Sequence, residues 1–575
     1  MIRRKQRREA NARRFRHRSI VVIAFFVALS AMLIGRAAHL QVLQHDFLVD
    51  EARKRHVRQM KLSAHRGPIV DRNNEPMAVS TPVDSVWANP QLLGPAIDEV
   101  PTLSTMIDVD SDQLLRRISR SADREFVYLR RHLSPSRAAE VRSLGLPGVE
   151  LQREYRRFYP AGEVVGHVLG FTNIDDQGQE GLEYAYDHWL AGQPGAKRVL
   201  KDEKGQVIDD VDSIRAARHG NTLTTSLDLR LQYLAYRELK RAIVEHDAES
   251  GSVVVLDIAT GEVLAMVNQP GYNPNDRSQF NASRYRNRAV TDILEPGSSI
   301  KPLIVSAAIA SNRYDATSVI DTSPGWVQVG AKRIEDQRNH GRLTLADIIA
   351  RSSNVGITKL AMRLEASELH RMLVRFGLGE LTGSGFPGES SGLLSHHTHW
   401  RAISQATLAY GYGVSVTPLQ LARAYAAIGA GGLLRPVSFV RQDQPVSGER
   451  ILAEDNAAAV LAMMERVVGP GGTGTKAGVA GYRVAGKTGT AWKFAAGGYS
   501  ENKYVSIFAG VAPVSAPRLA VVVIVDEPSR DDYYGGDVAA PVFARIVAES
   551  LRLLAITPDD LPDIDDGYVV QASAQ

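Results

Sequence analysis

One stretch, residues 295–302 (Glu-Pro-Gly-Ser-Ser-Ile-Lys-Pro), limits the fold and chemistry of this chain more than any other. Pro296 and Gly297 break the chain just before Ser298, and an apolar run follows, so a helix is expected to begin near this serine. Lys301 lies three residues further on and shares a helix face with Ser298. A serine hydroxyl becomes a nucleophile when a base takes its proton, and a desolvated lysine can be that base. The stretch therefore predicts a nucleophilic serine at a helix tip.

Two further short motifs follow along the chain. The serine-x-x-lysine pattern alone means little, because it recurs by chance at residues 500–503 without a preceding glycine. Downstream lie residues 352–354 (Ser-Ser-Asn) and residues 487–490 (Lys-Thr-Gly-Thr). Alone, the first would be a helix cap and the second a plain edge strand. In this order, however, the three motifs are those of the penicillin-interacting serine enzymes.

The motifs are expected to supply the parts of an acyl transfer. Ser298 is the predicted nucleophile, and Lys301 is the base that receives its proton. Ser352 is expected to relay that proton, while Asn354 holds Lys301 and hydrogen-bonds a substrate amide. Lys487 adds positive charge near Ser352, which is expected to keep Lys301 neutral by repulsion. These five residues form the predicted catalytic set.

The third motif is expected to bind substrate. Gly486 and Gly489 flank a lysine-threonine pair on a predicted strand, so a peptide backbone can lie against this strand and pair with it. Thr488 and Thr490 offer hydroxyls to a terminal carboxylate. The backbone N–H groups of Ser298 and Thr490 form the expected oxyanion hole. Thr488, Gly489 and Thr490 are the predicted substrate-binding residues.

The N-terminus predicts a membrane anchor. Residues 1–18 hold nine Arg or Lys and one acid, so this arm carries +8 of a whole-chain charge of +4 and leaves −4 for the rest. The body is therefore not basic, and no nucleic-acid partner is expected. Residues 20–43 form an apolar run interrupted by Arg36, about 36 Å long as a helix. Small residues at 28–30 leave a cleaved signal peptide as the alternative. An uncleaved anchor is favoured, with the arm in the cytoplasm and the remaining chain outside.

The length of the chain and its pattern of charged and apolar residues predict several domains and segments. The 575 residues are too many for one core, and the absence of cysteine excludes disulfides and thiolate catalysis. The expected parts are a cytoplasmic arm (1–18), a transmembrane anchor (19–43), a mixed pedestal domain (44–220), a catalytic domain (221–557) and a loose acidic tail (558–575). The pedestal is expected to begin with a helix over residues 44–60.

The catalytic domain is predicted to be α+β, with an antiparallel sheet flanked by helices. A hairpin is expected at its start and three strands near its end, with helices clustered between them. The predicted strands are 252–256, 263–267, 482–492, 504–512 and 519–525, and the predicted helices are 229–245, 343–350, 357–364, 367–376, 418–428, 456–468 and 540–554.

Three other patterns are rejected as sites. Residues 383–388 match GxGxxG in letters, but Pro387 spoils the turn that a dinucleotide fingerprint needs. Residues 396–399 hold three histidines without a nearby carboxylate, so an exposed loop is favoured over a metal site. Residues 410–413 (Tyr-Gly-Tyr-Gly) are interpreted as aromatic–glycine packing. No metal and no cofactor are expected.

Beyond its motifs, the chain resembles class B penicillin-binding proteins, most of all the septum-specific FtsI type. The likeness covers nearly the whole length: the arm and anchor, residues 66–73 (Arg-Gly to Asp-Arg-Asn), residues 158–160 (Phe-Tyr-Pro), the three motifs, and residues 533–536 (Tyr-Tyr-Gly-Gly). Asn74 stands where the family often has glycine, which affects only a turn. The resemblance implies a pedestal of the penicillin-binding-protein dimerisation type and a transpeptidase/β-lactamase-like domain.

The resemblance also implies a function. Ser298 would attack the D-Ala-D-Ala bond of a peptidoglycan stem, release D-alanine and pass the acyl group to an amine of a neighbouring stem, and β-lactams would acylate the same serine. It further implies that the protein is anchored in the inner membrane, with its catalytic domain in the periplasm, and that it acts at the division septum. The implied partners are a glycan polymerase of the FtsW type and other division proteins. An elongation-type class B enzyme remains the close alternative, and a non-catalytic division scaffold or β-lactam sensor is the alternative from another class.

Overall fold

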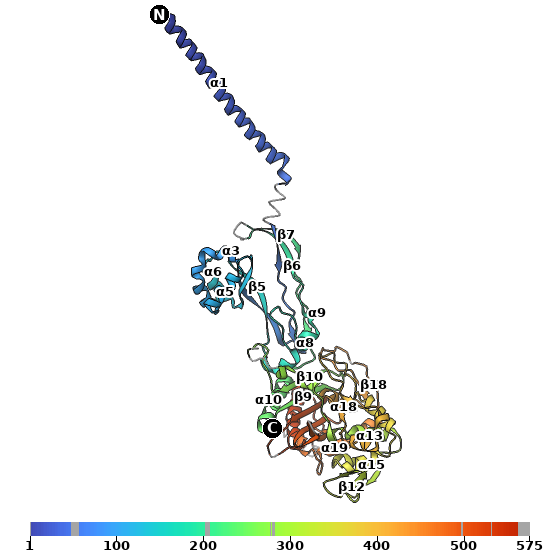
Figure 1. Ribbon diagram of the computed structural model, residues 1–575. Coiled ribbons are helices and arrows are strands. Elements are labelled where there is room, and N and C mark those ends of the chain that lie inside the picture. Colours follow the sequence, from blue (N-terminus) through green and yellow to red (C-terminus); the bar gives the residue numbers. More distant parts are fainter. Residues whose placement is uncertain are drawn as a thin grey trace, which may run out of the picture. The chain divides into compact units, whose positions relative to one another are not determined.

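The computed structural model describes residues 2–47, 57–201, 207–276, 278, 282–444, 446–495, 498–530 and 532–561 (Figure 1). The chain divides into two compact units. The first comprises Met1–Ala64, Pro82–Glu154 and Gln193–His219, and the second comprises His65–Thr81, Tyr155–Gly192 and Gly220–Gln575. Two segments from the predicted pedestal range, 65–81 and 155–192, thus pack within the second unit.

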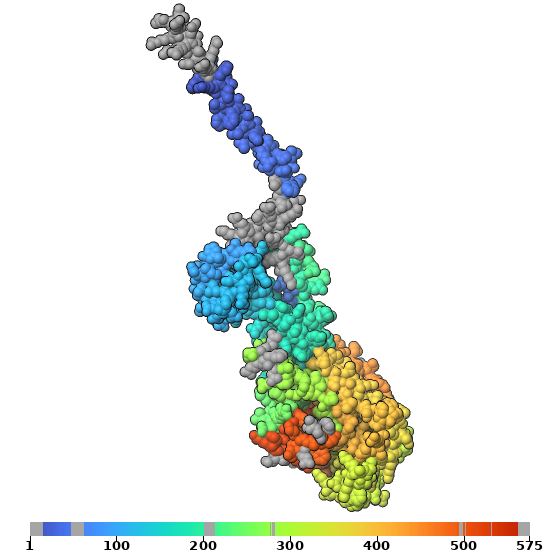
Figure 2. Space-filling model, in the orientation of Figure 1, coloured from blue at the N-terminus to red at the C-terminus, as the bar shows by residue number. Residues whose placement is uncertain are grey.

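The first unit begins with helix α1, Ile2–Ala38, which continues as a short π-helical turn, His39–Leu43. Its segment Phe15–Leu43 has 29 residues and contains an 18-residue window with a mean hydropathy of 2.4. In the described part of the chain this is the one helix long and apolar enough to cross a membrane. Its apolar side chains are exposed rather than packed against protein (Figure 2). A membrane-spanning helix is expected to look this way, since lipid replaces protein around it.

The helix predicted over residues 44–60 is wrong at its C-terminal end. Residues 48–56 lie outside the described part, but Val57–Leu62 form strand β1. This strand pairs antiparallel with β6, Gly195–Lys201, which pairs in turn with β7, Val207–Arg215. Pairing with a strand distant in sequence therefore overrides the local helical pattern.

The remainder of the first unit is a small helical layer beside strands. Its helices are α3 Pro90–Leu93, α4 Val100–Ile107, α5 Ser111–Arg120 and α6 Pro135–Ser143, and its strands are β4 Val127–Leu133 and parts of β3 Pro76–Ala88 and β5 Val149–Phe158. The side chains of Asn89, Asp110 and Ser134 cap α3, α5 and α6 by accepting backbone N–H bonds. The apolar faces of these elements pack into one core, which includes Leu93, Leu103, Leu114, Ile118 and Leu129.

The second unit contains a five-stranded antiparallel sheet with strand order β10-β9-β21-β20-β19. The strands are β9 Ser250–Asp257, β10 Val263–Gln269, β19 Ala485–Ala495, β20 Gly498–Ala512 and β21 Leu519–Asp526. The predicted hairpin and the three later strands thus join one sheet, and the α+β prediction is confirmed. Strand β19, which carries the third motif, lies at the edge of the sheet.

Helices cover both faces of this sheet. In β9, Val254 and Leu256 belong to the core that includes α13, Lys301–Ala310, and α18, Pro418–Gly429. Their neighbours Val253 and Val255 belong to a second core with α10, Leu229–Glu245, and α20, Ala539–Leu553. Because successive strand side chains point to opposite faces, one apolar strand serves both cores.

Apart from α19, the other elements of the second unit are short. Its helices are α7 Gly166–Leu169, α8 Gly181–Ala185, α9 Asp187–Leu190, α11 Ala282–Tyr285, α12 Arg288–Thr291, α14 Leu345–Ala350, α15 Asn354–Ala361, α16 Ala366–Arg375, α17 Ala402–Leu408 and α19 Glu454–Val468. Its minor strands are β2 Ile69–Val70, β8 Leu223–Thr224, β11 Val319–Asp321, β12 Trp326–Val329, β13 Lys332–Glu335, β14 Arg342–Thr344, β15 Leu393–Leu394, β16 Val414–Ser415, β17 Leu433–Leu434 and β18 Glu449–Arg450.

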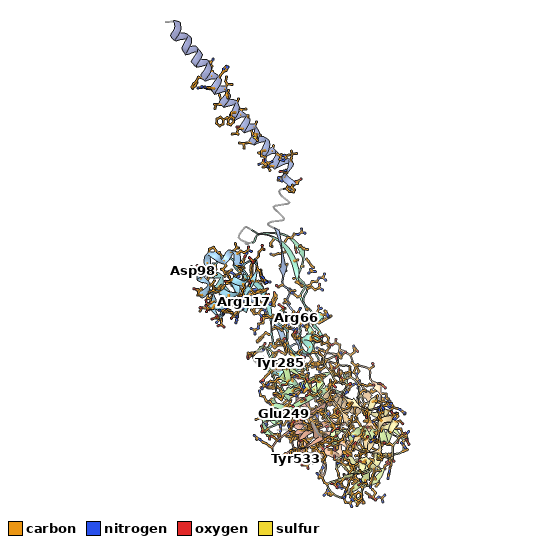
Figure 3. The ribbon with its side chains drawn as sticks, viewed as in Figure 1. Arg66, Asp98, Arg117, Glu249, Tyr285 and Tyr533 are labelled. Carbon is orange, nitrogen blue, oxygen red and sulfur yellow. The ribbon has the colours of Figure 1, made fainter. Side chains whose placement is uncertain are left out.

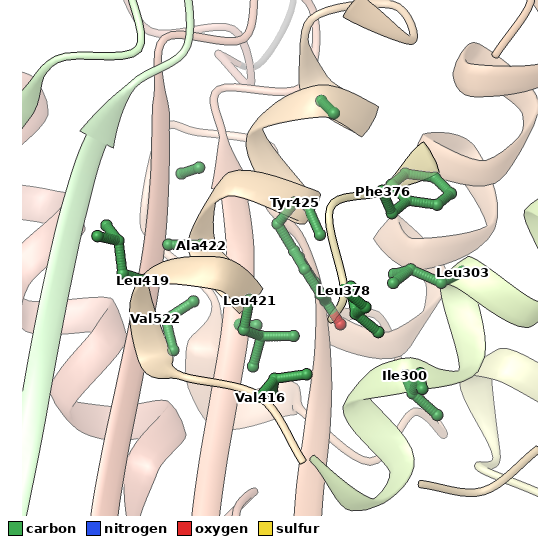
Figure 4. Packing of buried hydrophobic residues seen from close by; sticks show 14 of the residues in the cluster. Ile300, Leu303, Phe376, Leu378, Val416, Leu419, Leu421, Ala422, Tyr425 and Val522 are labelled. Atoms are coloured by element: carbon green, nitrogen blue, oxygen red, sulfur yellow. The ribbon is translucent and has the colours of Figure 1, made fainter. Parts of the chain in front are cut away.

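Helix α13 lies in the middle of the main core. Every residue from Lys301 to Ile309 is buried, as expected for a helix that is apolar around its whole circumference. Leu303 of α13 and Tyr425 of α18 lie together in this core (Figure 4). The hydroxyl of Tyr425 donates to the backbone oxygen of Ser299 at 2.6 Å, beside the predicted nucleophile. The core therefore fixes the turn that carries Ser298.

A buried ion network ties together three turn-rich stretches of the second unit. Arg66, labelled in Figure 3, places its Nε 2.6 Å from Glu183 Oε2, and Arg157 places its Nε 2.6 Å from Glu183 Oε1. Arg66 also pairs with Asp187 at 2.6 Å, and Arg157 donates to the backbone oxygen of Gly67 at 2.8 Å. Glu183 is fully buried. Glu183 is thus shared by two buried guanidinium groups, and Asp187 supplies the second negative charge.

Candidate active site

Ser298 lies in a tight turn ahead of α13. Residues Gly297–Ile300 form a 3₁₀ turn, and α13 follows directly from Lys301. Gly297 has φ +52°, and a Cβ there would lie 2.9 Å from the backbone oxygen of Thr490. Glycine is therefore required for both the backbone conformation and the close approach of β19. Ser298 is partly exposed, and its hydroxyl has no hydrogen-bond partner among the described residues.

Lys301 points into the site from the first turn of α13. Its Nζ lies 2.5 Å from the backbone oxygen of Ser352, 3.1 Å from Ser352 Oγ and 2.8 Å from Asn354 Oδ1. The residue is fully buried, and burial lowers the pKa of its amine to about 7. A lysine held in this way is neutral for much of the time at neutral pH, as a base must be.

Lys487 enters the same cluster from β19. Its Nζ lies 3.0 Å from Ser352 Oγ and 3.0 Å from the backbone oxygen of Thr488. Burial, and secondarily the charge of Lys301, holds the pKa of Lys487 well below its usual range. The sequence predicts that repulsion from Lys487 keeps Lys301 neutral. In the structure burial dominates for both amines.

Ser352 joins the two amines. Its Oγ accepts from Lys301 and Lys487, which uses both lone pairs of the hydroxyl and leaves its own proton free to be donated into the pocket. The residue has φ +58°, a left-handed conformation that is unfavourable for a side chain with a Cβ. Ser353 Oγ caps α15 by accepting from the N–H of Gly356 at 2.8 Å. The second motif is therefore a constrained turn followed by a capped helix.

The predicted substrate-binding residues lie on β19 beside these groups. The hydroxyls of Thr488 and Thr473 are 2.8 Å apart, and Thr490 Oγ1 accepts from the N–H of Gly535 at 3.0 Å. A Cβ on Gly489 would lie 2.8 Å from the backbone oxygen of Pro296. The glycine of the third motif therefore lets the strand pack against the nucleophile turn.

The motif residues open onto one pocket with a volume of about 460 Å³. It is lined by the motif residues Ser298, Ser352, Asn354, Thr488 and Thr490, together with Glu335, Asp336, Gln337, His340, Arg351, Thr473, Tyr534, Gly535, Gly536 and Asp537. Lys301 and Lys487 lie behind this wall, bonded to Ser352. Of these further lining residues, the sequence points only to Tyr534, Gly535 and Gly536, through the family likeness. Asp336 and Thr473 carried no signal that pointed to the site.

A carboxylate cluster elsewhere in the described chain has metal-like spacing. Oxygens of Glu249, Asp526 and Glu527 lie within 4.8 Å of one another. Lys493, however, places its Nζ 2.9 Å from Asp526 and 2.6 Å from Glu527. The lysine thus already supplies the positive charge that these carboxylates need.

An antiparallel sheet flanked by helices, with two buried lysines joined through a serine beside a serine at a helix tip, defines the class: the penicillin-interacting serine enzymes. Residues 251–548 match the family described as "Penicillin binding protein transpeptidase domain", and residues 61–225 match "Penicillin-binding Protein dimerisation domain". The chain belongs to the class B penicillin-binding proteins of the FtsI type, which confirms the resemblance read from its motifs.

Relatives match along almost the whole chain. Peptidoglycan D,D-transpeptidase FtsI of Escherichia coli K12 is 44% identical over 570 residues, covering 98% of this chain and 96% of that protein. The probable peptidoglycan D,D-transpeptidase PenA of Neisseria gonorrhoeae is 42% identical over 544 residues, covering 94% of this chain and 93% of that protein.

Solved structures agree with these matches. The transpeptidase domain of penicillin-binding protein 3 from Burkholderia pseudomallei is 41% identical, covers 59% of this chain and 98% of its own, and has a TM-score of 0.55. A peptidoglycan synthetase from Bifidobacterium adolescentis covers 88% of this chain and 98% of its own at 24% identity, with a TM-score of 0.70, and supports the fold.

Proposed function

We propose that the protein is a peptidoglycan D,D-transpeptidase that works through an acyl-enzyme on Ser298. One observation carries the proposal: Ser352 Oγ lies 3.1 Å from the amine of Lys301 and 3.0 Å from that of Lys487, in the pocket that Ser298 lines. This arrangement provides a neutral base and a route for its proton to a leaving group. The family match and the full-length relatives named transpeptidases support the same reaction.

In the first half-reaction, Ser298 Oγ attacks the carbonyl carbon between the two terminal D-alanines of a donor stem. Lys301 takes the hydroxyl proton and becomes an ammonium. Ser352 then donates its proton to the departing amine of D-alanine and recovers one from Lys301. The C–N bond breaks, D-alanine leaves with its nitrogen protonated, and an ester to Ser298 remains. The backbone N–H groups of Ser298 and Thr490 are proposed to stabilise the oxyanion.

In the second half-reaction, an amine of a neighbouring stem attacks the ester. Its proton returns through Ser352 and Lys301 to Ser298 Oγ, so the enzyme is regenerated and a new amide joins the stems. Asn354, which accepts from Lys301 at 2.8 Å, is proposed to hold the base in place. A β-lactam ring presents a similar amide to Ser298, but its leaving nitrogen stays attached to the acyl group.

Substrate is proposed to bind along β19. An edge strand offers unpaired backbone groups, to which an extended stem peptide can add. Thr488 and Thr490 are proposed to bind the terminal carboxylate of the donor, with Gly489 allowing the close approach of the strand. No metal or cofactor takes part in this proposal.

The N-terminal helix supports a single-pass anchor. We propose that the arm lies in the cytoplasm, that α1 crosses the inner membrane, and that the catalytic unit works in the periplasm at the division septum. Residues 15–43 offer their apolar surface to lipid or to another helix, and a membrane glycan polymerase of the FtsW type is the proposed partner there. Localisation of a fluorescent fusion tests the site of action: a septal band supports the proposal, while side-wall signal supports the elongation-type alternative.

A direct test uses the purified full-length protein and a peptidoglycan fragment with a pentapeptide stem. Release of D-alanine and formation of a cross-linked dimer are expected from the wild type and not from Ser298→Ala. The same variant separates the scaffold alternative in cells. If Ser298→Ala restores division to depleted cells, turnover at Ser298 is dispensable and the proposal is contradicted.

A further inference from the structure

Asp336 faces the second motif from a loop that no motif contains. It follows β13, and its backbone N–H donates to the oxygen of Gly325 at 3.0 Å. Its Oδ1 accepts from the N–H groups of Asn354 at 2.6 Å and Val355 at 3.1 Å. Its Oδ2 accepts from Ser353 Oγ at 2.5 Å. One carboxylate thus receives three bonds from the turn and first residues of α15.

From these bonds we infer that Asp336 is a positioning residue: it holds the Ser352–Asn354 turn against Lys301 and supplies the negative charge that this base faces. The inference rests on the proposed function and adds a residue to it. Asp336 is not placed against the reacting atoms, so it acts through Ser352, Asn354 and Lys301.

The positioning of the Ser352–Asn354 turn follows from the hydrogen bonds at the N-terminal end of α15. The first N–H groups of a helix lack partners within the helix, and a negative charge there is favourable. Asp336 accepts from the N–H groups of Asn354 and Val355, while Ser353 Oγ accepts from that of Gly356 and donates a hydrogen bond to Asp336. These bonds hold the backbone on the C-terminal side of Ser352, whose left-handed φ needs such support. They also fix the direction in which Asn354 Oδ1 meets Lys301.

The electrostatic effect follows from the charges around the base. Burial lowers the pKa of Lys301, whereas the carboxylate of Asp336 raises it. Lys487 faces Lys301 from β19. Asp336 also acts on His340, which in turn feels the charges of Arg338 and Arg351, and His340 and Arg351 line the same pocket as Asp336. In the same pocket wall, Glu335 pairs with Arg333 at 3.3 Å and Asp537 with Lys476 at 2.8 Å, so each is already matched by a cation.

The test is the pH profile of acylation by a fluorescent penicillin, measured as a second-order rate constant on the full-length protein. Asp336→Asn removes the charge and keeps an oxygen for the helix N–H groups. We expect its acid limb to move to lower pH by roughly half a unit to one unit, because Lys301 loses an opposite charge. We also expect its plateau rate to fall about tenfold through loss of alignment.

Two further variants separate charge from structure. Ser353→Ala removes one bond to the carboxylate, and with it the cap on the N–H of Gly356, but keeps the charge, so its plateau rate should fall while its acid limb stays in place. Asp347→Asn is the matched control, since this carboxylate also lies in the first turn of a helix but receives its bonds from the hydroxyl of Thr344 and from Arg466. It should keep the wild-type profile.

An acid limb that Asp336→Asn leaves at the wild-type pH overturns the electrostatic part, and an unchanged plateau in Ser353→Ala overturns the positioning part. If Asp336→Asn does not fold, Ser353→Ala decides alone: a lower plateau with an unmoved acid limb supports the inference, and a wild-type profile overturns it. Absence of acylation in the wild type would instead contradict the proposed function.

Discussion

Gly411 and Gly297 meet backbone to backbone. The N–H of Gly297 donates to the oxygen of Gly411 at 3.3 Å, and a Cβ on Gly411 would lie 2.0 Å from the oxygen of Gly297. Gly411 comes from the aromatic–glycine stretch that follows α17, and its contact is with the residue before the nucleophile. The glycine therefore sets the position of the turn that carries Ser298.

Gly411→Ala is expected to displace this turn and to lower the rate of penicillin acylation at least about tenfold, since small misplacements of reacting groups are costly. Gly413→Ala is the matched control. Gly413 also has a positive φ, of +80°, but a Cβ there meets nothing within 4 Å. Both variants carry backbone strain, and only the first carries the clash. Equal rates for the two in a stopped-flow acylation assay would show that the contact has no influence on Ser298.

The low pKa of Lys301 predicts the pH dependence of acylation. Burial lowers this pKa to about 7, and only the neutral amine can take the proton of Ser298. The rate should therefore rise with pH, reach half its plateau near pH 7, and fall about tenfold for each further unit toward acid. A midpoint near the ordinary lysine value of 10.5 would mean that the amine is not the base, or that it is not desolvated in solution.

The contact between Thr473 and Thr488 predicts an effect on binding. Their hydroxyls are 2.8 Å apart, and Thr488 is proposed to bind a substrate carboxylate. Thr473→Val keeps the shape and removes the bond, so the noncovalent affinity for penicillin should weaken about fivefold, or ~1 kcal/mol. The limiting acylation rate should stay close to wild type, because the lysine–serine cluster is untouched. A loss confined to the limiting rate would assign Thr473 to alignment of the cluster instead.

The ion network around Glu183 predicts a large effect on stability. Glu183→Gln leaves Arg66 and Arg157 buried without their shared carboxylate, which should destabilise the second unit by about 3–5 kcal/mol. Glu245→Gln is the control, because Glu245 and Arg241 are both exposed and 3.8 Å apart. Its thermal midpoint should match wild type, since exposed pairs contribute little. Similar midpoints for both variants, measured by circular dichroism, would contradict the account of the network.

The sequence predicted those parts of the site that local patterns encode. Pro296 and Gly297 before Ser298, and the spacing from Ser298 to Lys301, mark the turn that carries the nucleophile. The order of the three motifs then predicts that Ser352 and Lys487 belong to the same site. The structure joins Lys301, Ser352, Asn354 and Lys487 by hydrogen bonds. Apolar patterns also located the five strands of the central sheet and most of the helices between them, to within about three residues at most ends. Strand β20, however, begins at Gly498 rather than at residue 504, and helix α17 was not predicted.

What the sequence did not predict depends on contacts between distant segments. Asp336 lies 17 residues before Ser353, and a lone aspartate in a loop carries no sign of the helix it will cap. Arg66 and Glu183 lie 117 positions apart, so their pairing follows only from the folded chain. Strand β1 replaces the predicted end of a helix because β6 offers it a ladder of backbone bonds. Tertiary partners decide each of these cases.

The central claim concerns the bond that Ser298 forms, and mass spectrometry of the penicillin-treated protein tests it most directly. After digestion, the account predicts a penicilloyl mass on the peptide that contains Ser298, present in the wild type and absent from a folded Ser298→Ala variant. An adduct on another residue, or an intact wild-type protein that takes up no penicillin at all, would contradict it.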